Sequence, residues 1–312
     1  MQVKKANWFI LGIVVLPFLY QGIMHLVPVA LPLWLQLMMG ELVILVCIIG
    51  YCIASKVPLS QTIPHKKLHP GAIALIIVFT WLISPLVTVV NLLSQFLVPN
   101  EAAATMEMVK GLPFWALFGI VAIMPTFIEE IGFRGILLQN YRESGVWRGI
   151  FLSAVLFGLM HMNLNQMLYA TVLGILMGLL MEATNSIYSS MLMHFLINGS
   201  NVLMAYQQLQ TSTLSAAELE SSVEQLGMSY ESMLIIMVLV YGVFAAIGLV
   251  LAIPVYKKIA SLSGRAGYIN ALFKGNVRPY ETQKIVTIPL ILSIVCSVVY
   301  IVVDTIRKSG IW

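Results

Sequence analysis

Three clusters of polar residues lie inside segments of the chain that are otherwise apolar. Their sequences are IEEIGFRG at 128–135, FGLMH at 157–161 and HFLIN at 194–198. Together they supply two carboxyl groups, a guanidinium, two imidazoles and an amide, carried by Glu129, Glu130, Arg134, His161, His194 and Asn198. Because burying such groups in hydrocarbon is costly, they are kept there where they pair with each other or do chemistry.

These residue types could activate a water molecule and stabilise a developing negative charge. A carboxylate or an imidazole can act as general base, while imidazole and amide N–H groups can bind an oxyanion. The alternative for each residue is structural, since a histidine within a membrane often bonds a neighbouring helix and Glu130 with Arg134 could form a plain ion pair. For any single residue the two interpretations are equal, but the clustering favours a site.

Helical spacing predicts which of these side chains share a face. Glu130 and Arg134 are four residues apart and stack on one face, while Glu129 points to a different side. We therefore expect Glu130 to pair with Arg134 and Glu129 to need another partner. Counted at ~1.5 Å per residue from the predicted cytoplasmic helix ends, Glu129, His161 and His194 lie ~15, ~20 and ~12 Å deep. Three helices thus place polar groups near the middle of a ~30 Å hydrocarbon core.

The composition predicts an all-α, polytopic transmembrane helical bundle. Of the 312 residues, 60% are hydrophobic and 10% charged, whereas soluble domains carry about 25% charged residues. Apolar runs predict about eight or nine membrane segments, at 8–20, 31–55, 71–98, 112–139, 147–162, 166–182, 186–206, 230–256 and 285–305. Segments 147–162 and 166–182 are short, so one of them could be re-entrant. The first run is preceded by Lys4 and Lys5 but no cleavage pattern follows it, which indicates a retained helix.

Basic residues predict the orientation of these segments. The loops around 56–67, 142–148 and 257–284 are rich in lysine and arginine, while the stretch between Tyr206 and Tyr230 is acidic and contains neither. The positive-inside rule therefore predicts a cytoplasmic N-terminus. We expect an integral protein of the bacterial cytoplasmic membrane with the lipid bilayer as its surroundings. Nothing in the sequence supports nucleic-acid binding.

The chain divides into one core and two flanking parts within a single membrane unit. Residues 1–110 form N-terminal transmembrane helices, 111–206 the catalytic core, and 207–312 an acidic outside loop, the C-terminal helices and a basic cytoplasmic loop. Gly174 and Gly178 predict close helix packing. The remaining acidic residues of the spans, Glu41, Glu182 and Asp304, are expected to reach toward water near the helix ends.

The three clusters resemble motifs of a known family. EEIGFRG, FGLMH and HFLIN are similar to the EExxxR, FxxxH and HxxxN motifs of the CPBP intramembrane proteases, which include CAAX prenyl endopeptidases and bacteriocin-processing or immunity relatives. The resemblance implies an intramembrane endopeptidase acting on a membrane-associated peptide or protein. It also implies that Glu129 and His161 activate water, that His194 and Asn198 stabilise the oxyanion, and that Glu130 and Arg134 hold the first motif in place.

Other functions and a metal-dependent mechanism remain open at this point. A proton-coupled transporter would also bury carboxylates and histidines, although no second copy of any cluster is present. A non-catalytic scaffold or immunity protein could keep the fold. Glu129, His161 and His194 could also serve as zinc ligands, although no HExxH sequence is present. We favour a glutamate-driven hydrolysis without a cofactor, with zinc as the alternative.

Overall fold

The computed structural model describes residues 3–26, 31–100, 112–211, 227, 229–279 and 284–308, and within these residues the chain forms helices and no strand. The N-terminal part contains α1 (Val3–Leu26), α2 (Leu33–Ser55), α3 (Leu59–Thr62) and α4 (Pro70–Ser94). The C-terminal part contains α13 (Tyr230–Leu262), α14 (Ala266–Phe273) and α15 (Ile288–Lys308).

The central part begins with one helical segment whose α-helical winding is interrupted twice by a π-helix. It consists of α6 (Phe114–Phe118), the π-helix η1 (Gly119–Ile123), α7 (Met124–Glu130), the π-helix η2 (Ile131–Leu137) and α8 (Leu138–Arg142). It continues with α9 (Val146–Leu159), α10 (Leu164–Thr184) and α11 (Ile187–Thr211). All three polar clusters fall in this part of the chain.

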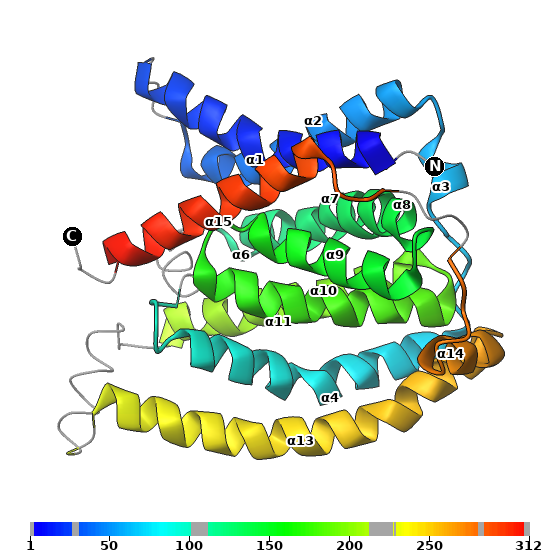
Figure 1. Ribbon diagram of the computed structural model, residues 1–312. Coiled ribbons are helices and arrows are strands. Elements are labelled where there is room, and N and C mark those ends of the chain that lie inside the picture. The colour runs from blue at the N-terminus through cyan, green and yellow to red at the C-terminus, as the bar shows by residue number, and fades with distance from the viewer. Residues whose placement is uncertain are drawn as a thin grey trace.

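The helices form three layers (Figure 1). One outer layer holds α1, α2 and α15, the other holds α4 and α13, and the segment from α6 to α11 lies between them. The polar clusters therefore lie in the middle layer, covered on both sides by apolar helices.

Seven of the described helical segments are long and apolar enough to cross a membrane. α9, with 14 residues, spans only ~21 Å, and α11, which carries His194 and Asn198, is the more polar helix packed beside α10. The predicted polytopic helical bundle is confirmed. α9 ends at Leu159, two residues before His161.

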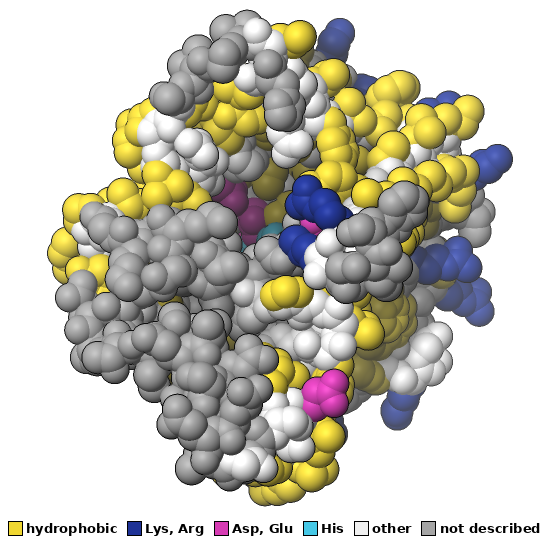
Figure 2. Space-filling view, turned by 90° about the vertical axis from the view of Figure 1, so that its left-hand side faces the viewer, with side chains coloured by type: hydrophobic (Ala, Val, Ile, Leu, Met, Phe, Trp, Pro, Cys, Tyr) yellow, Lys and Arg dark blue, Asp and Glu magenta, His cyan; other side chains and the backbone are white. Residues whose placement is uncertain are grey.

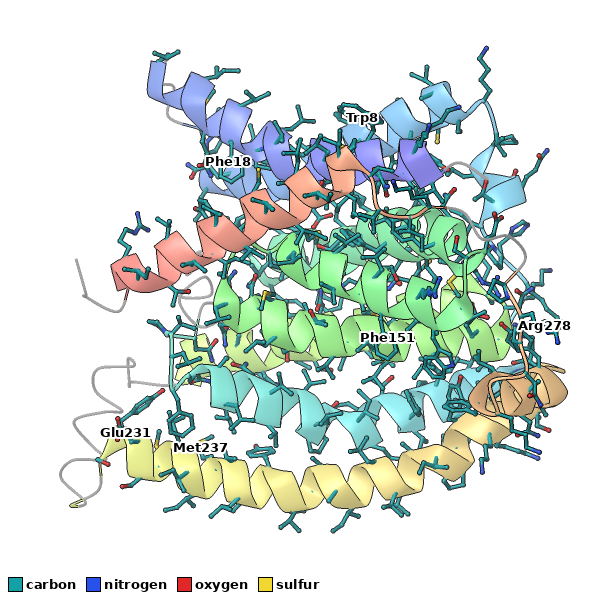
Figure 3. The ribbon with its side chains drawn as sticks, in the orientation of Figure 1. Trp8, Phe18, Phe151, Glu231, Met237 and Arg278 are labelled. Atoms are coloured by element: carbon teal, nitrogen blue, oxygen red, sulfur yellow. The ribbon has the colours of Figure 1, made fainter. Side chains whose placement is uncertain are left out.

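The outer surface of the bundle is apolar, as a lipid-facing surface requires. Trp8 on α1 is 64% exposed and Phe151 on α9 is 49% exposed, and the Trp8 side chain points away from the middle layer (Figure 3). Inside, glycines allow close packing: a Cβ added at Gly174 would lie 2.8 Å from the Cα of Ala154 on α9. The predicted packing role of this glycine is confirmed.

Buried polar contacts tie the outer layer to the core. Asn7 of α1 donates from Nδ2 to the carbonyl oxygen of Ile285 and to Oγ1 of Thr287, at 2.8 Å each, and accepts from the Tyr141 hydroxyl of α8 at 2.6 Å. The first and last helices are thus joined to the segment that carries the first polar cluster.

The expectation that Glu182 reaches toward water is wrong. Glu182, near the end of α10, is 2% exposed. Its Oε2 accepts from Arg142 Nη2 and the Tyr268 hydroxyl at 2.8 Å each, and Arg265 Nη2 lies 3.4 Å away. Burial raises the pKa of Tyr268, so its hydroxyl keeps the proton that it donates. Basic side chains from the end of α8 and from the α13–α14 turn neutralise the carboxylate there, which offsets its removal from water.

The described basic loops gather at one end of the molecule. Lys66 donates to the carbonyl oxygen of Ser263 at 3.3 Å, which brings the α3–α4 loop to the end of α13. Arg278 lies at this end, whereas Glu231 lies at the start of α13, at the opposite end (Figure 3). The N- and C-termini also lie at opposite ends (Figure 1). Asp304, close to the C-terminal end, pairs with Lys308 at 2.7 Å.

Which end faces the cytoplasm stays a prediction from charge, and labelling can test it. Single cysteines at Ser215, which lies outside the described residues, and at the exposed Asn276 are placed in a chain without its three native cysteines. An impermeant maleimide added to intact cells is expected to label position 215 and not 276. Labelling both positions after lysis is the control, and labelling of 276 alone in intact cells would reverse the orientation.

Candidate active site

Glu129 and Glu130 are the last two residues of α7, where the helix widens into the π-helix η2. Both are buried, as is Arg134 one turn later, with exposures of 5%, 0% and 1%. The helix fits against its neighbours closely because Gly132 has no side chain: a Cβ there would lie 3.2 Å from the Phe9 ring. The first cluster is therefore held in a tightly packed helix.

Glu130 has two charged or polar partners on one oxygen. Its Oε1 lies 2.9 Å from Arg134 Nη1 and 2.9 Å from His194 Nδ1. The expected Glu130–Arg134 ion pair is present. The contact of Glu130 with His194 on α11 was not expected, because residue spacing within one helix cannot predict contacts with another helix. A carboxylate can only accept, so His194 Nδ1 must carry the proton.

This contact sets the tautomer and the direction of the His194 ring. Asn198 Nδ2 lies 3.1 Å from His194 Nε2 and 3.2 Å from the carbonyl oxygen of Val121. With its proton on Nδ1, a neutral His194 accepts at Nε2 from the Asn198 amide. A carboxylate that fixes an imidazole in this way makes the other nitrogen the reactive one.

Glu129 faces the same imidazole from the other side. Its Oε2 lies 3.6 Å from His194 Nε2, slightly beyond a direct hydrogen bond. The prediction that Glu129 and Glu130 point to different partners is therefore only partly right. The two nitrogens of one ring reach both glutamates, because α11 packs across the end of α7.

Phe157 links the three clusters through its ring. Arg134 Cζ lies 4.2 Å from the ring centroid, and the centroids of His161 and His194 lie 5.4 and 6.0 Å from it. The guanidinium thus rests on an aromatic face, which favours a buried cation. Phe157 positions one side chain from each cluster.

His161 lies in the turn that joins α9 to α10. Asn163 forms this turn by donating to the His161 carbonyl oxygen at 2.9 Å and accepting from the Gln166 amide at 2.8 Å. Met162 between them has a left-handed backbone with φ 55°. His161 is half-buried, so it is the histidine with more room for a small molecule beside it.

The sequence interpretation missed one residue of this site. Glu41 of α2 was expected to reach toward water, but it is 9% exposed and its carboxyl group interacts with that of Glu129. The available signal was that Glu41 lies inside the predicted span 31–55, where a carboxyl group is costly unless it has a partner or a function. Same-helix spacing could not show its partner, because α2 and α7 are far apart in the sequence.

The structure brings together all six residues of the three clusters, with Glu41 added. Figure 2 shows a hollow in one face of the molecule with acidic and histidine side chains inside it. Within the described part of the chain, no group of three or more His, Cys, Asp and Glu side chains is arranged to hold a metal ion. His194 Nδ1 is bonded to Glu130, and metal-binding histidines commonly bond a carboxylate through the nitrogen that does not bind the metal, so the zinc site considered from the sequence stays an alternative.

Comparison with known proteins identifies this part of the chain. Residues 111–200 match the family model described as type II CAAX prenyl endopeptidase Rce1-like. No curated protein and no solved structure matched the chain. The match covers less than a third of the 312 residues, and it contains all three clusters. The resemblance predicted from the motifs is confirmed.

Proposed function

We propose, from the premise that residues 111–200 form the core of a CPBP-family intramembrane protease, that this protein is an endopeptidase for a membrane-associated peptide or protein. One observation carries the proposal: Glu129 and Asn198 meet at His194 Nε2, at 3.6 and 3.1 Å, deep within the apolar middle layer. A base and potential oxyanion donors thus face one point, which is what amide hydrolysis requires.

In the proposed first step, Glu129 removes a proton from a water molecule. The water oxygen forms a bond to the carbonyl carbon of the substrate, and the carbonyl oxygen becomes an oxyanion. His161, half-buried in its turn, orients this water. General-base assistance of this kind contributes about 10²- to 10⁴-fold to a rate.

In the second step, the proton passes from Glu129 to His194 Nε2, 3.6 Å away in this structure. Once Nε2 carries a proton it no longer accepts from Asn198, so one Asn198 N–H is released. Both groups can then donate to the oxyanion. Glu130 keeps Nδ1 bonded throughout and stabilises the imidazolium that forms, and Arg134 keeps Glu130 ionised.

In the last step, the C–N bond breaks as the nitrogen takes the proton from His194. The products are a new carboxyl group and a new amine, and the site returns to its starting protonation. We do not carry the prenyl specificity of the matching family's name over to this chain, because no described feature identifies a prenyl site.

The test is a comparison of cleavage products from purified protein in detergent. Wild-type and Glu129→Ala proteins are incubated with a pool of single-span membrane peptides, half of them with a prenylated C-terminal cysteine. New termini are identified by mass spectrometry. Products that need Glu129 are expected; identical product sets from both proteins would contradict the proposal and leave a transporter or a scaffold.

A metal-free reaction is part of the proposal and predicts that activity survives chelation. Cleavage by purified protein after exhaustive treatment with EDTA and phenanthroline is expected to equal that of the untreated sample, because each ionisable group of the proposed steps is a protein side chain. Metal content is measured on the same active sample. Stoichiometric zinc, with activity lost on its removal and restored on its return, would make Glu129, His161 and His194 ligands.

A further inference from the structure

Glu41 is a buried acid that the steps above do not use. It lies on α2, outside the matched segment 111–200, and its Oε2 is buried without a hydrogen-bond partner among the described residues. None of the described ion pairs includes it. Burying such an oxygen is costly, so its presence within an apolar helix calls for a functional reason.

The packing of α2 brings Glu41 to the first polar cluster. α2 contacts η1, α7 and η2, and Ile44 lies 3.5 Å from the position that a Cβ of Gly132 would occupy. Glu41 precedes Ile44 by three residues, as Glu129 precedes Gly132. The two carboxyl groups lie on the facing sides of this contact and interact with each other.

Two carboxyl groups can share a hydrogen bond only if one of them carries a proton. The base in the proposed reaction is ionised Glu129, so in the reactive state the proton lies on Glu41. The other groups that face Glu129 are His194, with Nε2 at 3.6 Å, Glu130 on its own helix, which is paired with Arg134, and Tyr169 on α10.

We propose that Glu41 is a positioning residue that donates a hydrogen bond to Glu129 and so holds the base in place. This inference rests on the proposed function and deepens it. One oxygen of Glu129 accepts from Glu41, and the other is left to accept the proton of the water. The proton of Glu41 is not consumed, so the hydrolysis balances as before.

If Glu41 acts as a hydrogen-bond donor, two substitutions that change the size of its side chain little should affect the reaction differently. Glu41→Gln keeps a donor, the side-chain amide, whereas Glu41→Leu removes the donor and fills the space with apolar atoms. Glu41→Leu leaves one buried oxygen of Glu129 without its donor, so some loss of stability is expected. It is also expected to lose kcat by about 10- to 100-fold, as loss of an orienting partner typically does. KM should stay unchanged, and Glu41→Gln should keep most of the wild-type kcat.

The experiment measures kcat, KM and thermal unfolding in detergent, with the peptide that wild type cleaves fastest in the assay above. Glu129→Gln is the inactive reference. Tyr51→Phe is the matched control on the same helix, because the Tyr51 hydroxyl accepts from Asn140 Nδ2 at 2.9 Å, away from Glu129, and its loss should affect stability and not kcat.

Each outcome decides the question. Wild-type kcat in Glu41→Leu would overturn the inference while leaving the proposed function intact, and a Glu41→Gln variant as inactive as Glu129→Gln would make Glu41 itself a proton-transfer group, which also overturns it. If Glu41→Leu does not fold, the kcat of Glu41→Gln still decides between these. If no product depends on Glu129, the proposed function fails and this inference fails with it.

Discussion

Glu129→Gln is expected to abolish cleavage while leaving the protein folded. Glutamine is nearly isosteric with glutamate but cannot take a proton from water, so the loss should be about 10²- to 10⁴-fold in kcat. Stability should change little, because the ion pair that Glu129 forms among the described residues, with His194 Nε2, is long at 3.6 Å. An amide at this position can also still bond Glu41.

The measurement pairs kcat with thermal unfolding and detergent-solubilised yield. Glu231→Gln is the control, since this exposed glutamate at the start of α13 lies at one end of the molecule. It should leave both kcat and unfolding unchanged. If Glu129→Gln cleaved normally while Glu130→Gln was stable and inactive, the roles of the two glutamates would have to be exchanged.

The membrane fold was predictable because hydrocarbon imposes a length and a composition on each crossing helix. The predictions from the sequence were wrong about where some helices end. The predicted span 230–256 continues in the structure to Leu262, where Lys257 and Lys258 extend the helix beyond its apolar part. Basic side chains can reach the interface from a continuing helix, so a charge marks the membrane boundary and not the helix end.

The candidate site was predictable where residues of one helix act together, and not where helices meet. Spacing of four residues predicted the Glu130–Arg134 pair, which lies at 2.9 Å. It could not predict that His194 bonds Glu130 or that Glu41 faces Glu129, since both contacts depend on the packing of helices distant in sequence. Glu182 was misjudged for the same reason, because its basic partners lie at the end of α8 and in the α13–α14 turn.

Glu130→Gln is expected to lower stability as well as activity, because Glu130 serves two partners. Arg134 is 1% exposed, and among the described ion pairs its partner is Glu130. Removing one member of a buried pair leaves a buried charge and commonly costs about 3–5 kcal/mol. The same substitution removes the carboxylate that fixes the His194 ring at Nδ1, so the imidazole loses its orientation and the stabilisation of its charged form.

A double substitution separates these two effects. Glu130→Gln with Arg134→Met removes the whole ion pair, and replacing both members by neutral side chains is often close to neutral for stability. The double variant should therefore unfold at a higher temperature than Glu130→Gln alone. It should remain as inactive as the single variant, because His194 still lacks its carboxylate partner. Equal stability of Glu130→Gln and wild type would show that the pair does not hold the first cluster in place, and activity regained in the double variant would show that Glu130 does not act through His194.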